Sequence, residues 1–330
     1  MGIDQGHGDN SYEAPWACQV KCVDYDTFGL YLVQIASEPD APVKHAIVKD
    51  RIEDLRAELT PAERQVTSVL LRDYPVAGLQ SVTKFAEAAE VSTPTVIRLA
   101  QKLGFSGFSD MQEQLREEAA AQIKRPILKG QGWPKERGDS HAFRDFAEAV
   151  FDNLNRTIER LDPKSFDAIA RLLSSPKKRL YLSGGRITRS NADYFFNHLQ
   201  IIRADVTLLS PSPNVWPQFL LDMDKNAVLV IFDIRRYEQD LDRLAQLTKE
   251  RGATIVLFTD QWGSPISNKA DHVLNAMVEV PSSWDSTVAI NLIVEALVAE
   301  IQRRRWSAAK ERIEALEDMF KATRIFRRGG

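Results

Sequence analysis

VSTPTVIRLAQKLGFSGF, at residues 91–108, predicts a short helix between two turns. Ser92 and Pro94 suit the start of a helix, because the backbone donor that proline lacks would be unpaired in the first turn anyway. Gly104 suits the left-handed residue that commonly ends a helix. Apolar residues recur at helical spacing and predict one buried face, made of Val96, Leu99 and Leu103. Another face carries Thr95, Arg98 and Lys102.

The residues before this helix predict the rest of a helix-turn-helix. Thr60, Pro61 and Glu63 match a capping box, in which two side chains three positions apart each accept a backbone hydrogen bond. A helix follows and must end near Tyr74-Pro75. A second helix is predicted after Ser81, and a tight turn at 90–92 leads into the helix at 93–103. Two short helices in this arrangement place the second one in a DNA major groove.

The net charge of −3 at pH 7 is at first sight unsuitable for DNA binding. Phosphate binding depends on where the cations lie, however, and not on the total for the chain. Residues 51–125 carry nearly equal numbers of basic and acidic side chains, but residues 92–104 contain Arg98 and Lys102 and no acid. The positive charge is therefore concentrated on the helix predicted to face the groove.

This stretch resembles the N-terminal helix-turn-helix domain of the RpiR (MurR/RpiR) family of transcription regulators. The resemblance rests on LTPAE at 59–63, STPTVIR at 92–98 and KLGFSGF at 102–108, in that order and spacing, and it covers residues 51–122. It implies double-stranded operator DNA as a partner. By this resemblance Arg98 is the expected guanine reader, and Lys102 is the expected phosphate contact. The other candidate DNA contacts are Ser92, Thr93, Thr95 and Gln101.

Strands and helices alternate in the second half of the chain. Apolar strands are predicted at 179–183, 205–209, 227–232, 254–259 and 272–274. Helices are predicted near 141–160, 163–173, 188–199, 215–222, 238–251 and 286–304. This alternation with short connections predicts an α/β domain whose mainly parallel sheet is flanked by helices. Ligands bind such sheets at the carboxyl ends of the strands, beside helix N-termini.

This half resembles the SIS (sugar isomerase) domain that accompanies the helix-turn-helix in RpiR proteins. The resemblance rests on LSGGRIT at 182–188 and on later stretches such as KERGAT at 249–254. SIS domains hold sugar phosphates with a serine in the first glycine-rich loop and with a Ser-x-Ser-Gly-x-Thr loop after a later strand. Here Thr188 stands in place of the first serine. In the second loop charged side chains replace the hydroxyl cradle, with Asp233, Arg235 and Glu238 at its hydroxyl positions.

Two interpretations of this altered pocket stay open. Arginine pairs with carboxylate or phosphate through two parallel hydrogen bonds, so the pocket is expected to bind a small anionic metabolite, either a sugar phosphate, a sugar acid or a carboxylate. Alternatively, the arginines and acids form an internal ion network in a pocket that has lost its ligand. The segment Ser282–Ser286 either closes over the pocket, or its Asp285 or Ser286 caps the next helix. The expected effector-binding residues are Ser183, Gly184, Gly185, Arg186, Thr188, Asp233, Arg235, Arg236, Glu238, Ser282 and Ser283.

The composition, with 44% apolar and 27% charged residues, is typical of a globular protein. The chain has no apolar run long enough for a membrane span, and its first residues, MGIDQGHGDN, do not match a secretory signal, so we expect a cytoplasmic protein. Cys18 and Cys22 have no partners at metal-ligand spacing, which predicts unpaired thiols and no metal site. His198 and His272 are expected to be structural. No catalytic residue and no cofactor is predicted.

The length of 330 residues favours two domains. We expect a poorly ordered extension at 1–48, the helix-turn-helix domain at 49–123 and a linker at 124–140. An SIS-like effector-binding and oligomerisation domain is expected at 141–305, and a basic helix at 306–330 that either packs in an oligomer or touches DNA. The predicted function is a homodimeric or homotetrameric transcription regulator whose operator binding responds to the metabolite. The alternatives are an SIS-type phosphosugar isomerase and a regulator whose ligand-free second domain only dimerises.

Overall fold

The structure is a computed structural model that describes residues 47–123, 129 and 141–325. The predicted linker therefore lies outside the described residues except for Lys129, and so do the predicted extension up to residue 46 and both cysteines. Ile47 and Val48 are buried and the first helix starts at Val48, so the last two residues of the predicted extension belong to the folded part of the chain. None of the helices in the described ranges combines the length and the apolar character that crossing a membrane requires.

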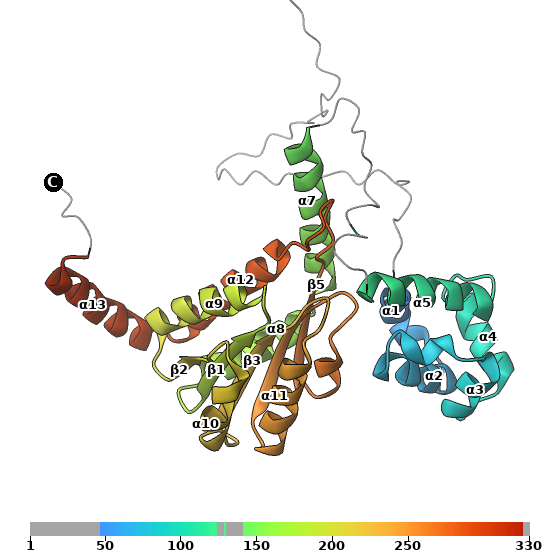
Figure 1. Cartoon of the computed structure of the whole chain (residues 1–330), viewed down its shortest axis with the longest axis horizontal. Helices are drawn as coiled ribbons and strands as arrows, with labels where there is room; N and C mark the ends of the chain where they lie inside the picture. Colours follow the sequence, from blue (N-terminus) through green and yellow to red (C-terminus); the bar gives the residue numbers. More distant parts are fainter. Residues whose placement is uncertain (1–46, 124–128, 130–140, 326–330) are drawn as a thin grey trace, which may run out of the picture. The chain divides into compact units, whose positions relative to one another are not determined.

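The first domain consists of five helices (Figure 1). They are α1 (Val48–Asp54), α2 (Pro61–Arg72), α3 (Val82–Ala88), α4 (Thr93–Lys102) and α5 (Phe108–Ile123), with short 3-10 turns at η1 (Arg56–Glu58) and η2 (Val76–Leu79). The capping box is formed as predicted, since Glu63 N donates to the Thr60 hydroxyl and Thr60 N donates to the Glu63 carboxylate. Helices α3 and α4 are joined by a tight turn in which Glu90 adopts a left-handed conformation, with φ of 53°.

A single apolar cluster holds these helices together. The predicted inward face of α4 is correct, because Val96 and Leu99 are fully buried and Leu103 is nearly so. These side chains pack with buried residues of the other four helices, including Ile52, Leu70, Phe85 and Leu115. The face of α4 that bears Arg98 is consequently the one left outside the core. Gly104 ends the helix with φ of 88°, as expected of a left-handed terminator.

The second domain has a five-stranded sheet between two layers of helices (Figure 1). Its strands are β1 (Arg179–Gly184), β2 (Val206–Leu208), β3 (Ala227–Phe232), β4 (Thr254–Asp260) and β5 (His272–Ala276). Its helices are α7 (Ala142–Arg160), α8 (Pro163–Ser174), α9 (Arg189–Ile202), α10 (Trp216–Leu221), α11 (Gln239–Glu250) and α12 (Val288–Arg304), with short η3 (Pro213–Val215) and η4 (Pro265–Asn268). The predicted fold class is therefore confirmed.

The strand order β2-β1-β3-β4-β5 determines where a ligand can bind. All four neighbouring pairs are parallel, so the carboxyl ends of all strands lie at one edge of the sheet. The chain leaves β1 toward β2 on one side and returns to β3 on the other side of β1. The loops after β1 and β3 therefore diverge at the carboxyl edge, and a crevice opens at this topological switch point.

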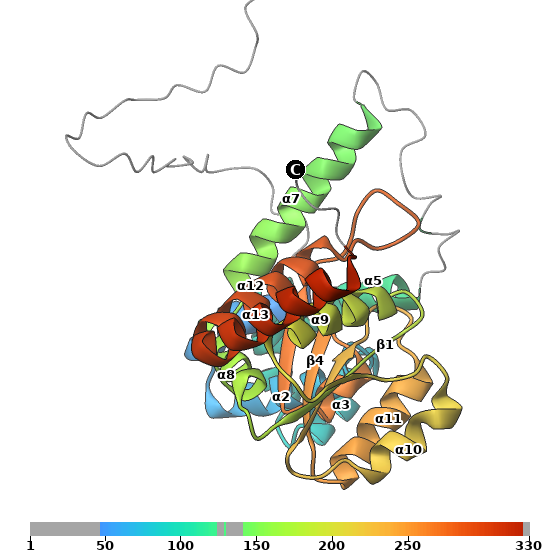
Figure 2. The same ribbon diagram turned by 90° about the vertical axis from the view of Figure 1, so that its left-hand side faces the viewer.

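Alternate residues of each strand pack into opposite layers, as the twofold period of a strand requires. In β3, Val228, Val230 and Phe232 pack toward α8, α9 and α12. Its intervening residues Leu229 and Ile231 pack toward α10 and α11. The strand is buried along its whole length, which is why its sequence is a continuous apolar run. Figure 2 shows α9 and α12 on one side of the sheet, and α10 and α11 on the other.

A last helix, α13 (Trp306–Thr323), follows α12 directly and packs beside α9 (Figure 2). Ala309 is fully buried in the apolar layer that contains α9, and the Arg312 side chain donates to the Gln200 carbonyl oxygen at 2.8 Å. The residues after 325 lie outside the described part of the chain. These contacts lie within one chain, so the two roles expected for this segment, packing in an oligomer and contact with DNA, both stay predictions.

Candidate functional site

The exposed face of α4 is the first candidate site. Arg98 is exposed, and among the described residues no acidic group pairs with it. Its Nη2 donates to the Thr95 hydroxyl at 3.4 Å, and the Thr95 and Ser92 hydroxyls are 2.9 Å apart. Ser92 is at the N-cap position but makes no capping bond. Arg98 therefore points outward, with neighbouring hydroxyls that accept and donate hydrogen bonds.

The other candidate DNA contacts differ in how accessible they are. Gln101 is exposed, one turn from Arg98, and Thr93 is half-buried at the first position of α4. Lys102, the expected phosphate contact, is engaged within its own domain. Its Nζ donates to the Glu58 carbonyl oxygen at 2.7 Å and pairs with the Glu63 carboxylate at 3.0 Å. A lysine held in this way stabilises the start of α2, and it is less available to DNA than its place on the helix predicts.

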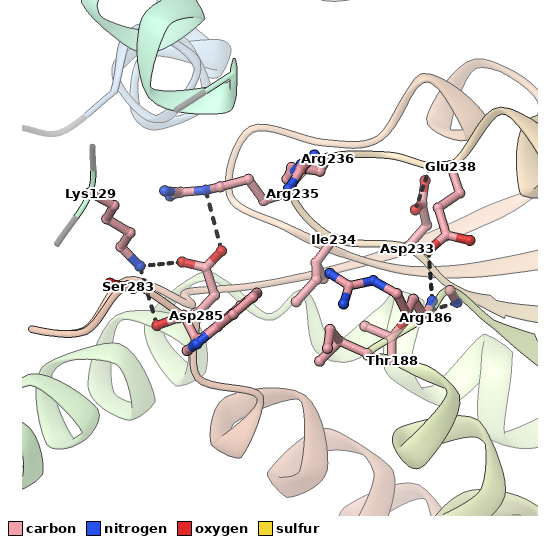
Figure 3. Close-up of a pocket in the computed structure, with 13 residues that line it drawn as sticks. Lys129, Arg186, Thr188, Asp233, Ile234, Arg235, Arg236, Glu238, Ser283 and Asp285 are labelled. Atoms are coloured by element: carbon pink, nitrogen blue, oxygen red, sulfur yellow. Dashed lines mark hydrogen bonds and ion pairs between the residues drawn. The ribbon is translucent and has the colours of Figure 1, made fainter. Parts of the chain in front are cut away.

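The second candidate site is a cavity of about 410 Å³ between the loops that follow β1 and β3 (Figure 3). A small-molecule site is typically of this size. Eight of the expected effector residues line it: Gly185, Arg186, Thr188, Asp233, Arg235, Arg236, Glu238 and Ser283. Ser183 and Gly184 lie at the end of β1 and are not in the lining, and Ser282 instead accepts a bond from Trp284 N. The lining also includes Lys129, Ile187 and Ile234, which were not expected there, and Trp284 and Asp285 from the segment that was expected either to close over the pocket or to cap the next helix.

Thr188 lines the cavity, but its hydroxyl is already used by the fold. The hydroxyl donates to the Phe232 carbonyl oxygen at 2.6 Å and accepts from Gly185 N at 2.9 Å. These bonds tie the loop after β1 to the end of β3. A ligand oxygen could therefore accept a hydrogen bond from Thr188 only by displacing the bond to Phe232, and the expected role of this hydroxyl in effector binding stays a prediction.

Arg235 is a structural member of the pocket wall. Its side chain is 5% exposed, stacks over the Trp262 ring with 4.0 Å to the centroid and pairs with Glu279 at 2.8 Å. Its Nε is 3.3 Å from the Asp285 carboxylate, which also pairs with Lys129. An ion network thus exists, but its acids are Glu279 and Asp285 and not the expected Asp233 and Glu238. The N-cap residue of α12 is Thr287, so neither Asp285 nor Ser286 is the cap, although the Ser286 hydroxyl accepts a bond from Val288 N at 3.3 Å.

Arg186 and Arg236 remain as the pocket's unpaired cations. Both side chains are exposed, and within the described ranges neither has an acidic partner. The Arg186 guanidinium lies 5.9 Å from the centre of the Trp284 ring. Arg236 has a left-handed backbone with φ of 66°. These two guanidinium groups are the available donors for an anionic ligand.

Asp233 is buried on the opposite side of the cavity from Lys129 and Asp285 (Figure 3). It accepts hydrogen bonds from the Ser264 hydroxyl and from Glu238 N. Burial raises the pKa of Asp233 to about 7, and the nearby Asp260 and Glu238 add to the increase, whereas the two hydrogen bonds oppose it. Near neutral pH the pocket therefore contains a carboxyl group that is only partly ionised.

This raised pKa predicts a pH dependence of stability. The folded chain keeps a proton on Asp233 that the unfolded chain releases, so the contribution of this group to the free energy of unfolding falls as pH rises from about 4 to about 7. When the pH is raised from 5 to 7.5, we expect the free energy of unfolding of the unchanged chain to fall by roughly 2 kcal/mol more than that of Asp233→Asn. Urea unfolding of both proteins at the two pH values measures the difference, and parallel pH profiles would contradict it.

Among the described residues no group of three or more His, Cys, Asp or Glu is arranged to hold a metal ion. His198 packs against the Tyr194 ring at 4.5 Å, and His272 lies in β5. Neither histidine is in the pocket lining. The cavity can therefore bind a ligand through hydrogen bonds and charge.

The fold and these two sites define a class of two-domain protein, with a helix-turn-helix module followed by a parallel α/β domain that has a pocket at its switch point. Family comparisons agree with this division. A model described as "Helix-turn-helix domain, rpiR family" matches residues 47–122, and one described as "SIS domain" matches residues 172–300. The chain belongs to the RpiR family of helix-turn-helix regulators that carry a SIS domain.

Individual relatives are distant in sequence. An uncharacterized HTH-type transcriptional regulator of Haemophilus influenzae is 25% identical over 233 residues, covering 70% of this chain and 80% of the relative. The HTH-type transcriptional regulator HexR of Pseudomonas aeruginosa is 22% identical over 289 residues, covering 83% and 96%. The crystal structure of the sugar isomerase domain of an RpiR transcription factor from Sphaerobacter thermophilus matches with a TM-score of 0.50 and 21% identity, covering 53% of this chain and 97% of that one. This last similarity concerns the fold alone.

Proposed function

We propose that this chain is a DNA-binding transcription regulator whose operator affinity is modulated by a small anionic metabolite in the SIS domain. The observation that carries the first part is the exposed face of α4, where Arg98 stands without an acidic partner among the described residues. An arginine so placed can form the two parallel hydrogen bonds that distinguish guanine in the major groove. The relatives named as HTH-type transcriptional regulators support the same function.

The second part of the proposal rests on the pocket. Its unpaired cations, Arg186 and Arg236, can pair with a carboxylate or phosphate group through two hydrogen bonds each. The pocket lies at the switch point, where parallel α/β domains bind their ligands. We propose that the effector is held by the loops after β1 and β3, with Ser283 and Trp284 covering it.

We propose that the domain binds this ligand without turning it over. An isomerase requires an acid or base that reaches the substrate proton. Asp233 is buried and accepts from the Ser264 hydroxyl, and Asp285 pairs with Lys129. Glu238 is held at the loop after β1 by Arg186 N through one of its two oxygens. The relatives named as HTH-type transcriptional regulators support binding without turnover. The proposal further includes a cytoplasmic homodimer or homotetramer, because two-fold symmetry would present paired α4 helices to an inverted repeat.

The test begins with operator selection. The purified full chain is mixed with fragments of its own genome, retained duplexes are sequenced, and the enriched site is assayed in competition with random duplex. We expect enrichment of a palindromic site, and release or tightening of that site by at least one anionic metabolite. A chain that retains no fragment preferentially would refute the regulator, and turnover of a sugar phosphate would restore the isomerase alternative.

A further inference from the structure

The Glu238 carboxylate does not make the contact that its position in the chain leads us to expect. Glu238 is the N-cap residue of α11, yet its side chain makes no bond to its own helix. The side chain instead reaches to the loop after β1, where Oε1 accepts from Arg186 N at 2.6 Å (Figure 3). It fills the space beside Gly185, because a Cβ atom at that glycine would come within 2.7 Å of Oε1. Any side chain at 185 would therefore push the Glu238 carboxylate out of its present position.

The loop that Glu238 covers is where an anion would otherwise bind. It follows the first strand, precedes the N-terminus of α9 and presents backbone donors at the switch point. The Arg186 N donor is taken by Glu238, and the Thr188 hydroxyl is taken by Phe232. A phosphate group would have to displace the Glu238 carboxylate from this loop. The two negative groups would then repel each other at close range. The Glu238 carboxylate thus occupies the loop at residues 185–188, which we call the anion cradle.

The remaining groups of the cavity indicate what kind of molecule does fit. In the part of the chain that the structure describes, Glu238 Oε2 has no hydrogen-bond donor, so it can accept one from a ligand hydroxyl. The unpaired guanidinium groups of Arg186 and Arg236 can bind a ligand carboxylate. A molecule with hydroxyls at one end and a carboxylate at the other satisfies both groups. A sugar phosphate also offers hydroxyls, but its phosphate carries a charge of about −1.5 to −2 at pH 7, so the Glu238 carboxylate repels it more strongly than it repels a carboxylate.

We propose that Glu238 is a specificity-determining residue that excludes phosphate, so that the effector is a hydroxy acid without a phosphate group. This inference rests on the proposed function, since it narrows the anionic effector to one chemical class. Glu238 would then act twice, as the internal occupant of the anion cradle and as the acceptor for a ligand hydroxyl.

The test uses thermal unfolding of the full chain at constant ionic strength with four probes: D-gluconate, D-glucose, D-glucose 6-phosphate and inorganic phosphate. A ligand that binds the folded state raises the melting temperature with concentration. For the unchanged chain we expect stabilisation by gluconate and no response to the other three. Glu238→Thr, which removes the carboxylate and adds a hydroxyl, should bind both phosphate probes at least about tenfold more tightly than the unchanged chain and lose the gluconate response.

Two further variants make the test decisive. Glu238→Ala also empties the cradle and serves if the threonine variant does not fold. Glu250→Thr makes the same change at the far end of α11, where the exposed carboxylate accepts a hydrogen bond from Gln246, and should behave as the unchanged chain. The proposal is overturned if glucose 6-phosphate stabilises the unchanged chain as well as gluconate does. It is also overturned if gluconate has no effect, or if neither variant at 238 gains phosphate binding.

Operator retention is measured on the same proteins, and it separates this inference from the proposed function. Probe responses as expected with no preferred duplex would leave the pocket assignment standing and refute the regulator. A preferred duplex with the opposite probe responses would keep the regulator and refute the role of Glu238.

Discussion

Arg98→Ala should abolish most of the preference for operator over random duplex. Arg98 is the exposed guanidinium on the outer face of α4, it has no acidic partner among the described residues, and Thr95 accepts a bond from it at 3.4 Å. A bidentate contact to guanine contributes about 1–3 kcal/mol of discrimination. Its loss should therefore reduce selectivity roughly tenfold to a hundredfold for each half-site. Competition binding of operator and random duplex at one fixed salt concentration measures the ratio.

Two companion variants separate base reading from charge and from folding. Arg98→Lys keeps the positive charge but not the planar fork, so it should lose selectivity while retaining the salt dependence of binding. Arg116→Ala removes one arginine from an exposed position of α5, where it pairs with Glu113 at 2.7 Å, and selectivity should be unchanged. If Arg98→Ala weakens operator and random duplex by the same factor, Arg98 contacts phosphate and does not read bases.

Lys102 shows why a helical face alone does not predict DNA contacts. The spacing of Arg98 and Lys102 places both away from the apolar face, and this part of the prediction agrees with the structure. The partners of Lys102, however, are Glu58 and Glu63, which are distant in sequence and meet it only when α2 packs against α4. A residue's availability thus depends on tertiary contacts that a local pattern does not contain.

Sequence patterns predicted the bounds of a strand best where the strand is completely buried. The apolar run at 227–232 matches β3 along its whole length, because a central parallel strand is covered on both faces. The sequence predicted β1 and β4 one residue shorter than they are, since Gly184 and Asp260 do not have strand-forming side chains. Both continue in the ladder through pairing with a neighbouring strand.

The pocket's location was predictable, but its internal pairing was not. The loops after β1 and β3 follow from the alternation of strands and helices and from the SIS resemblance. The acids that hold Arg235 come from Glu279 and Asp285, beyond β5, and Asp285 had an equally good local explanation as a helix cap. The reach of Glu238 across to Arg186 N likewise depends on the adjacency of β1 and β3.

Asp260→Ala should destabilise the second domain more than any other single change in the pocket region. Asp260 is fully buried at the end of β4, and its carboxylate accepts four hydrogen bonds. The donors are Arg235 N at 2.6 Å, the Tyr237 hydroxyl at 2.8 Å, Trp262 N at 3.0 Å and Gly263 N at 3.1 Å. Burial beside Asp260 raises the pKa of Tyr237 well above its ordinary value, so this phenol stays a donor.

Removing the carboxylate leaves these donors buried without an acceptor, which should cost about 3–5 kcal/mol in the free energy of unfolding. Urea unfolding followed by tryptophan fluorescence does not report on the first domain, because residues 47–123 contain no tryptophan, whereas Trp216, Trp262 and Trp284 lie in the second. Asp242→Ala, which breaks only the partly exposed pair with Lys269, should cost less than about 1 kcal/mol.

A change at Asp260 also tests how the loop between β3 and α11 is held in place. Asp260 fixes both Arg235 and Tyr237, and the loop between β3 and α11 carries Arg236 and Glu238 to the cavity. If Asp260 positions this loop, a folded Asp260→Asn variant should lose the gluconate response while its operator affinity without ligand is unchanged, since α4 lies in the other domain. An Asp260→Asn variant with an intact gluconate response would show that the strand ends alone hold the loop in place.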